Sequence, residues 1–200
     1  MGTRYEIRLS GSGGQGLILA GIILAEAAGV YEDKYVAQTQ SYGPEARGGS
    51  SKAEVVISDE EIDYPMATRP DVLLAMSQRS CDAYYFDLKP EGMLVVDSTF
   101  VSQTPTTKAI RIPFTQLARQ ELGGEMVANI VALGALVTLT KILSLKALES
   151  AVLSRVPPGT EELNRKALEL GAREARAVIK ARRPETMRGH GPNDEGTPYE

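Results

Sequence analysis

A glycine-rich segment near the N-terminus constrains the fold of this 200-residue chain more than any other feature. Residues 5–9 alternate apolar and polar side chains, as a half-buried strand does, and lead directly into Gly11-Ser12-Gly13-Gly14-Gln15-Gly16. The residues that follow, 17–28, are apolar on almost every face of a helix. A strand, a glycine loop and a buried helix in this order are typical of the start of a βαβ unit.

The rest of the chain continues this alternation and then becomes helical. Strands are expected at residues 35–40, 52–57, 72–76, 93–96 and 109–112, and helices at 78–86, 115–122, 127–143, 146–154 and 160–182. The pattern predicts a Rossmann-like three-layer α/β domain with a mostly parallel sheet and C-terminal helices. We expect one domain over residues 1–183. Residues 184–200 contain little apolar surface, so we expect a tail that is flexible or ordered by a partner.

The glycine loop has three possible interpretations. Gly11, Gly13 and Gly16 match the G-x-G-x-x-G pattern that presents backbone N–H groups to a pyrophosphate. A dinucleotide site also requires an acidic residue at the end of the second strand. That strand ends at Thr39-Gln40-Ser41, and the nearby acids Glu32 and Asp33 precede it. A bound NAD or FAD, a phosphate or partner backbone, and a packing turn all remain open.

A second loop combines charge with unusual backbone freedom. Residues 41–49 read Ser-Tyr-Gly-Pro-Glu-Ala-Arg-Gly-Gly, and Glu45 and Arg47 are its charged pair. Such a segment suits an anion clamp or an interface. A solvated loop whose charges face water is the alternative.

Composition excludes several kinds of site. Cys81 is the only Cys and His190 the only His, so this chain alone forms no internal disulfide and no cysteine-ligated zinc or iron–sulfur site. One His beside a Gly/Pro-rich stretch also argues against a catalytic triad. The net charge is −4 without a basic block, which disfavours nucleic-acid binding.

Hydropathy gives an expectation about location. Charged residues come before any apolar segment at the N-terminus, unlike a secretory signal. The longest apolar run, residues 126–140, is shorter than the roughly 20 residues that cross a bilayer. We therefore expect a cytoplasmic chain without membrane association.

Three segments together resemble the gamma subunit of 2-oxoacid:ferredoxin oxidoreductases. They are the first glycine loop, residues 41–49, and Asn129-Ile130-Val131-Ala132-Leu133-Gly134-Ala135. Their order and spacing fit over residues 4–180, and the second segment is the specific one. Ala46 stands where a Met is also common. The likeness is greatest to the 2-oxoglutarate (2-oxoglutarate synthase) branch.

The resemblance implies a component of a larger enzyme. Complexes of this family decarboxylate a 2-oxoacid on thiamine diphosphate with Mg²⁺, pass electrons through iron–sulfur clusters to ferredoxin, and form an acyl-CoA. The resemblance assigns those cofactors to the alpha, beta and delta subunits. It also implies that the gamma chain packs against these subunits, near the side of the active site from which CoA enters. This chain lacks the Gly-Asp-Gly segment and the Cys set that those cofactors need.

The same resemblance names candidate residues on the CoA side or at an interface, none of them catalytic or metal-binding. They are Gly13, Gly14, Gln15, Gly16, Tyr42, Gly43, Glu45, Arg47, Gly48, Gly49 and Asn129. Two alternatives stay open: a free-standing NAD(P)-binding reductase, and a scaffold whose loops only form interfaces. Cys81 is expected to be a small, half-buried side chain, and Asp71 and Asp97 are expected to cap or pair.

Overall fold

The computed structural model describes residues 4–42 and 50–182, and these form a six-stranded sheet in the order β2-β3-β1-β4-β5-β6. The strands are β1 (Arg4–Ser12), β2 (Tyr35–Tyr42), β3 (Ser50–Ser58), β4 (Val72–Ala75), β5 (Met93–Asp97) and β6 (Ile110–Ile112). β1, β4, β5 and β6 pair in parallel, whereas β3 lies antiparallel between β2 and β1. The predicted α/β class is confirmed, and β3 makes the sheet mixed.

The βαβ unit expected after the glycine loop is present but split, since β1 and β2 run in the same direction with β3 between them. β2 does not lie beside β1, because β3 fills the position between them. Residues 43–49 are too few for a parallel crossover, which takes about a dozen residues or more, so β3 returns antiparallel to β2. β3 then pairs with β1 along its whole length, from Arg4 opposite Ser58 to Ser12 opposite Ser50.

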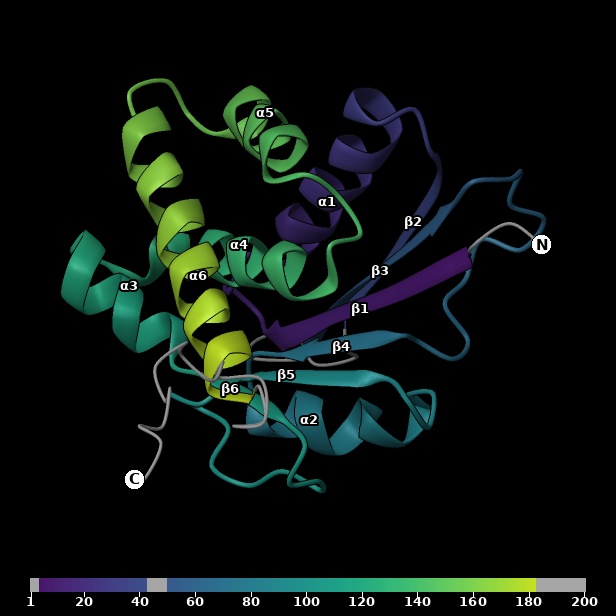
Figure 1. Cartoon of the computed structure of the whole chain (residues 1–200), viewed down its shortest axis with the longest axis horizontal. Helices are drawn as coiled ribbons and strands as arrows, with labels where there is room; N and C mark the ends of the chain where they lie inside the picture. The colour runs from purple at the N-terminus through teal and green to yellow at the C-terminus, as the bar shows by residue number, and fades with distance from the viewer. Residues whose placement is uncertain (1–3, 43–49, 183–200) are drawn as a thin grey trace, which may run out of the picture.

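Helices cover both faces of the sheet, as the three-layer prediction required (Figure 1). One face carries α1 (Leu17–Tyr31), α3 (Phe114–Leu122), α4 (Ala128–Thr140), α5 (Leu145–Arg155) and α6 (Glu161–Arg182). The other carries α2 (Gln78–Tyr84), which continues into the short helix η1 (Tyr85–Asp87). A second short helix, η2 (Glu125–Val127), leads into α4. No helix among the described residues is long and apolar enough to span a bilayer.

The predicted helix at residues 127–143 ends earlier than expected. Lys141 takes a left-handed conformation with φ of 55°, and its N–H bonds to the carbonyl of Val137. Such a helix end usually carries Gly. A Lys in this position leaves no signal in the sequence, so the apolar pattern alone extended the helix too far.

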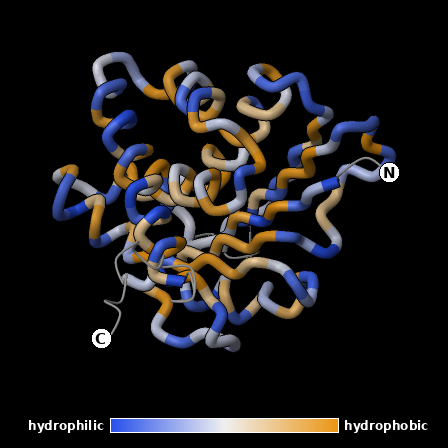
Figure 2. The backbone as a smooth tube through the Cα atoms, viewed as in Figure 1, coloured by the Kyte–Doolittle hydropathy of each residue, from blue (hydrophilic) through white to orange (hydrophobic). Residues whose placement is uncertain are grey.

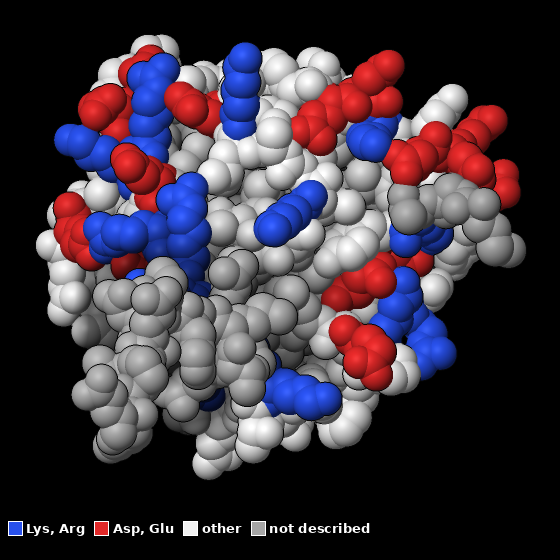
Figure 3. Space-filling model, in the orientation of Figure 1, with Lys and Arg blue, Asp and Glu red and all other residues white. Residues whose placement is uncertain are grey.

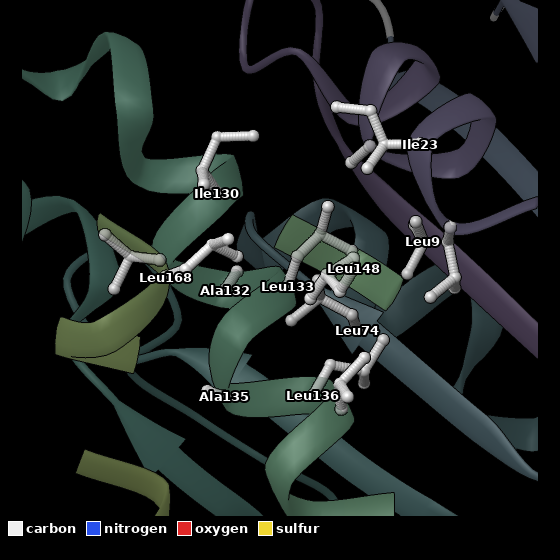
Figure 4. Close-up of a cluster of buried hydrophobic side chains, with 14 of the residues drawn as sticks. Leu9, Ile23, Leu74, Ile130, Ala132, Leu133, Ala135, Leu136, Leu148 and Leu168 are labelled. Atoms are coloured by element: carbon white, nitrogen blue, oxygen red, sulfur yellow. The ribbon is translucent and has the colours of Figure 1, made fainter. Parts of the chain in front are cut away.

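α4 is the central helix of the core. Residues 128–137 are all buried, and Leu133 and Leu136 belong to the same apolar cluster as Leu9 of β1, Ile23 of α1 and Leu74 of β4 (Figure 4). Figure 2 shows the matching pattern, with hydrophobic residues concentrated in the strands and hydrophilic residues on the outer turns of the helices. A helix that is hydrophobic on every side is typically buried, as α4 is.

Two glycines let α4 and α6 cross in backbone contact. A Cβ on Gly171 would lie 1.8 Å from the carbonyl oxygen of Val131, and one on Gly134 would lie 2.2 Å from that of Leu168. Gly134 belongs to the third motif of the sequence, and its position is explained by this packing.

Candidate functional site

The glycine loop lies at a topological switch point of the sheet. The connection after β1 passes through α1 on one face, and the connection after the neighbouring parallel strand β4 passes through α2 on the other. In open α/β sheets, ligands bind outside the carboxyl ends of two neighbouring strands whose following connections leave toward opposite faces. Residues 13–16 occupy this position.

Gln15 fastens the loop to both strands. Its side-chain Oε1 accepts a hydrogen bond from the N–H of Ser12 at 2.7 Å, and its Nε2 donates one to the carbonyl of Met76 at 2.9 Å. A Cβ on Gly11 would lie 2.3 Å from that Oε1, so only glycine leaves room for the side chain there. Because both ends of its amide are engaged, Gln15 shapes the loop.

Asn129, on α4, holds the C-terminal end of the glycine loop. Its Nδ2 donates to the carbonyl of Gly16 at 3.1 Å, while its Oδ1 accepts from the N–H of Ile130 at 2.9 Å. Asn129 is only 4% exposed. The structure therefore brings together the first and third motifs of the sequence.

The remaining part of the loop is open. Gly13 and Gly14 are exposed, Gly14 has φ of +92°, and a Cβ placed there would meet no atom within 4 Å. Gly16, with φ of +71°, begins α1 without a side-chain cap, and the first turn of α1 carries no acidic residue. Backbone N–H groups at an uncapped helix start favour a negatively charged group.

The second motif starts and ends beside the glycine loop. Tyr42, at the end of β2, is 72% exposed and pairs with Ser51, while Ser50 pairs with Ser12. Both flanks of the segment thus leave the sheet at the edge where the glycine loop sits. The candidates Gly43, Glu45, Arg47, Gly48 and Gly49 lie outside the described residues, as do residues 184–200.

The other residues singled out from the sequence are structural. Asp71 accepts from the N–H of Glu6 and pairs with Lys89 at 2.7 Å, and Asp97 accepts from the N–H groups of Thr99 and Thr115. Both carboxylates therefore cap or pair, as expected. Cys81 is fully buried rather than half-buried as expected, and burial raises the pKa of its thiol. The described residues contain no group of three or more His, Cys, Asp or Glu placed to hold a metal ion.

Sequence reasoning missed a groove beside this site. It has a volume of about 440 Å³ and runs between the first turn of α1, the start of α4 and the connection from α5 to α6. We call it the apolar groove; its lining is Leu19, Leu122, Gly123, Gly124, Met126, Val127, Asn129, Ile130, Val156, Pro157, Thr160, Leu163 and Asn164. These residues come from three separate stretches of the chain, so no single stripe in the sequence marks the groove.

Comparison with known proteins gives one consistent family. The profile of the pyruvate ferredoxin/flavodoxin oxidoreductase family matches residues 6–174. The 2-oxoglutarate synthase subunit KorC of Methanocaldococcus jannaschii is 53% identical over 165 residues, which cover 80% of this chain and 88% of the relative.

Two solved structures extend the comparison. The gamma subunit of a keto/oxoacid ferredoxin oxidoreductase from Geobacter sulfurreducens is 52% identical, with a TM-score of 0.78 over 86% of this chain and 99% of that one. A 2-oxoglutarate:ferredoxin oxidoreductase chain from Magnetococcus marinus, solved with 2-oxoglutarate, coenzyme A and succinyl-CoA, is 26% identical with a TM-score of 0.74. That match covers 87% of this chain and 31% of the other.

Proposed function

Because this chain belongs to the pyruvate ferredoxin/flavodoxin oxidoreductase family and is a subunit of a 2-oxoacid:ferredoxin oxidoreductase, we propose that its complex acts on 2-oxoglutarate. The reaction converts the 2-oxoacid and CoA to an acyl-CoA and CO₂ and reduces ferredoxin. The observation that supports this substrate is the 53% identity to KorC over 88% of that subunit's length. We also propose a cytoplasmic location for the complex.

Alpha, beta and delta subunits are the proposed partners, and they hold the redox and carbon–carbon chemistry. Iron–sulfur clusters take Cys thiolates as ligands, and the only Cys here, Cys81, is fully buried with a raised pKa. The chain therefore does not fit a cluster. Thiamine diphosphate, when bound by a partner, supplies the electron sink for decarboxylation. We further propose that residues 1–183 form one domain.

The proposed task of this chain is to receive the anionic part of CoA. The exposed backbone of Gly13 and Gly14, together with the uncapped start of α1, suits a phosphate group. Gln15 and Asn129 hold that backbone in place through hydrogen bonds of their side-chain amides to the chain itself. From the second motif we propose Arg47 as a cation for the same ligand, and Tyr42, Gly43, Glu45, Gly48 and Gly49 as further candidates on the CoA side or at an interface.

The test is steady-state kinetics of the co-expressed, purified complex with ferredoxin as acceptor. The kcat/KM for 2-oxoglutarate should exceed that for pyruvate at least about tenfold, a difference of about 1.4 kcal/mol. Arg47→Ala should raise KM for CoA several-fold without loss of assembly. Arg176→Ala, an exposed arginine on α6, is the matched control. A preference for pyruvate would overturn the substrate, and assembly loss alone on Arg47→Ala would favour the scaffold.

The NAD(P)-dependent reductase is not favoured. β3 separates β2 from β1, so the end of β2 lies one strand further from the glycine loop than the end of a ribose-binding strand would. The family match also points to a different reaction class. Titration of the chain with NADPH should show no binding at submillimolar concentration.

A further inference from the structure

The apolar groove is chemically unlike the rest of the surface. None of the described residues that line it is charged, although 24% of the chain is. On the face shown in Figure 3, by comparison, basic and acidic side chains are interspersed over the helices. A hollow of about 440 Å³ without charge does not attract a phosphate or a carboxylate.

The polar side chains in the groove already have partners. Asn129 donates to the carbonyl of Gly16, Asn164 to the carbonyl of Thr160, and the hydroxyl of Thr160 to the carbonyl of Pro157. All three donors are thus engaged within the chain. What the groove offers to an occupant is apolar surface, so its occupant is apolar too.

The large side chains around the groove are unusually exposed. Met126 is 94% exposed, Leu19 39% and Leu163 37%. A single exposed apolar residue is ordinary, but several around one hollow form a patch of the kind that another protein covers.

We propose that the apolar groove seats an apolar segment of the partner subunit that is continuous with this domain in the Magnetococcus marinus chain. This inference rests on the proposed function. Because the match spans 31% of that longer chain, the same domain is one part of a single polypeptide there. In a complex of separate chains, burial of apolar surface must supply the attachment that the covalent link supplies in the longer one. Permanent interfaces are accordingly rich in apolar contacts.

The position of the groove explains what docking achieves. Asn129 forms part of its wall and also holds the carbonyl of Gly16, and Leu19 lies in the first turn of α1. A segment seated in the groove therefore packs directly behind the glycine loop. Docking places the partner and the proposed anion site on one continuous surface.

The test is co-expression of the full set of subunits with an affinity tag on a partner subunit. Met126→Asp and Leu163→Asp introduce a charge into the apolar groove, at side chains that are 94% and 37% exposed in this chain. Each should lower recovery of this chain in the complex at least about tenfold, a change of about 1.4 kcal/mol in binding. Phe86→Asp is the matched control, because Phe86 is 83% exposed on η1, away from the groove. It should be recovered like the wild type.

A photo-crosslinking residue at position 126 gives the second readout. It should join this chain to the partner subunit in the assembled complex. Wild-type recovery of both Asp variants, or a crosslink only to a second copy of this chain, would overturn the proposal while leaving the proposed function intact. Failure of the wild-type chain itself to bind any partner would overturn the proposed function as well.

Discussion

The side-chain amide of Asn129 donates a hydrogen bond to the carbonyl of Gly16, 3.1 Å away and 113 residues distant in the sequence. Asn129 lies in the first turn of α4, and Gly16 immediately precedes α1. Because α4 is buried on nearly every side, this hydrogen bond ties the glycine loop to the core of the molecule. The loop is preorganised before any ligand arrives.

Replacing Gly16 should therefore disturb the site more than replacing Gly14. Both have positive φ, which costs about 1–2 kcal/mol in an L-residue. A Cβ on Gly16 would also lie 2.6 Å from Nδ2 of Asn129, whereas one on Gly14 meets nothing within 4 Å. Gly16→Ala should lower the free energy of unfolding by about 2–3 kcal/mol and Gly14→Ala by about 1 kcal/mol, measured by urea denaturation.

A double variant separates crowding from backbone strain. Asn129→Ala removes the atoms that a Cβ at Gly16 would strike, so Gly16→Ala with Asn129→Ala should cost less than the sum of the single changes. The coupling should be at least about 0.5 kcal/mol, as for residues in direct contact. Strict additivity would show that the contact does not constrain the loop.

Gly16 and Asn129 also show how far the sequence carried the prediction. The strand, the glycine loop and the apolar helix were predicted in the right order because their hydrophobic periods differ clearly. That the loop and Asn129 meet could be inferred only through resemblance, since no local pattern links residues so far apart. The antiparallel insertion of β3 was missed because Lys52 to Ile57 alternates like any strand, and direction follows from the length of the preceding connection.

Gln15 should be sensitive to a change of one atom. An ionised Glu at this position keeps the acceptor for the N–H of Ser12 but faces the carbonyl of Met76 with a second acceptor. Gln15→Glu should lower the free energy of unfolding by about 1–3 kcal/mol at neutral pH. The loss should shrink below about pH 4, where the protonated carboxyl can donate again.

Gln116→Glu is the matched control, because Gln116 is exposed on α3. It should change the free energy of unfolding by no more than about 0.5 kcal/mol. Urea denaturation of both variants between acidic and neutral pH makes the comparison. Equal effects of the two changes would contradict the proposal that the hydrogen bonds of the Gln15 side chain stabilise the loop.

The crossing of α4 and α6 predicts a large effect from one methyl group. Gly171→Ala would place a carbon 1.8 Å from the carbonyl oxygen of Val131, so the two helices must separate. The cost should be about 3 kcal/mol or more, seen as a lower denaturation midpoint. Gly124→Ala is the control, since a Cβ there meets nothing within 4 Å and the backbone is extended. It should leave stability unchanged or raise it by up to about 1 kcal/mol.

Alkaline pH should reveal the environment of Tyr5. Burial, aided by the negative charge of Asp71, raises the pKa of its hydroxyl to about 12, against about 10 in the unfolded chain. The folded chain keeps a proton that the unfolded chain loses, so this group lowers stability as pH rises from about 10 to about 12 and has no effect below. Tyr5→Phe should flatten that part of the profile of unfolding free energy against pH. Tyr31→Phe, at an exposed tyrosine of α1, should leave the profile unchanged. A wild-type slope retained in Tyr5→Phe would assign the alkaline loss to another group.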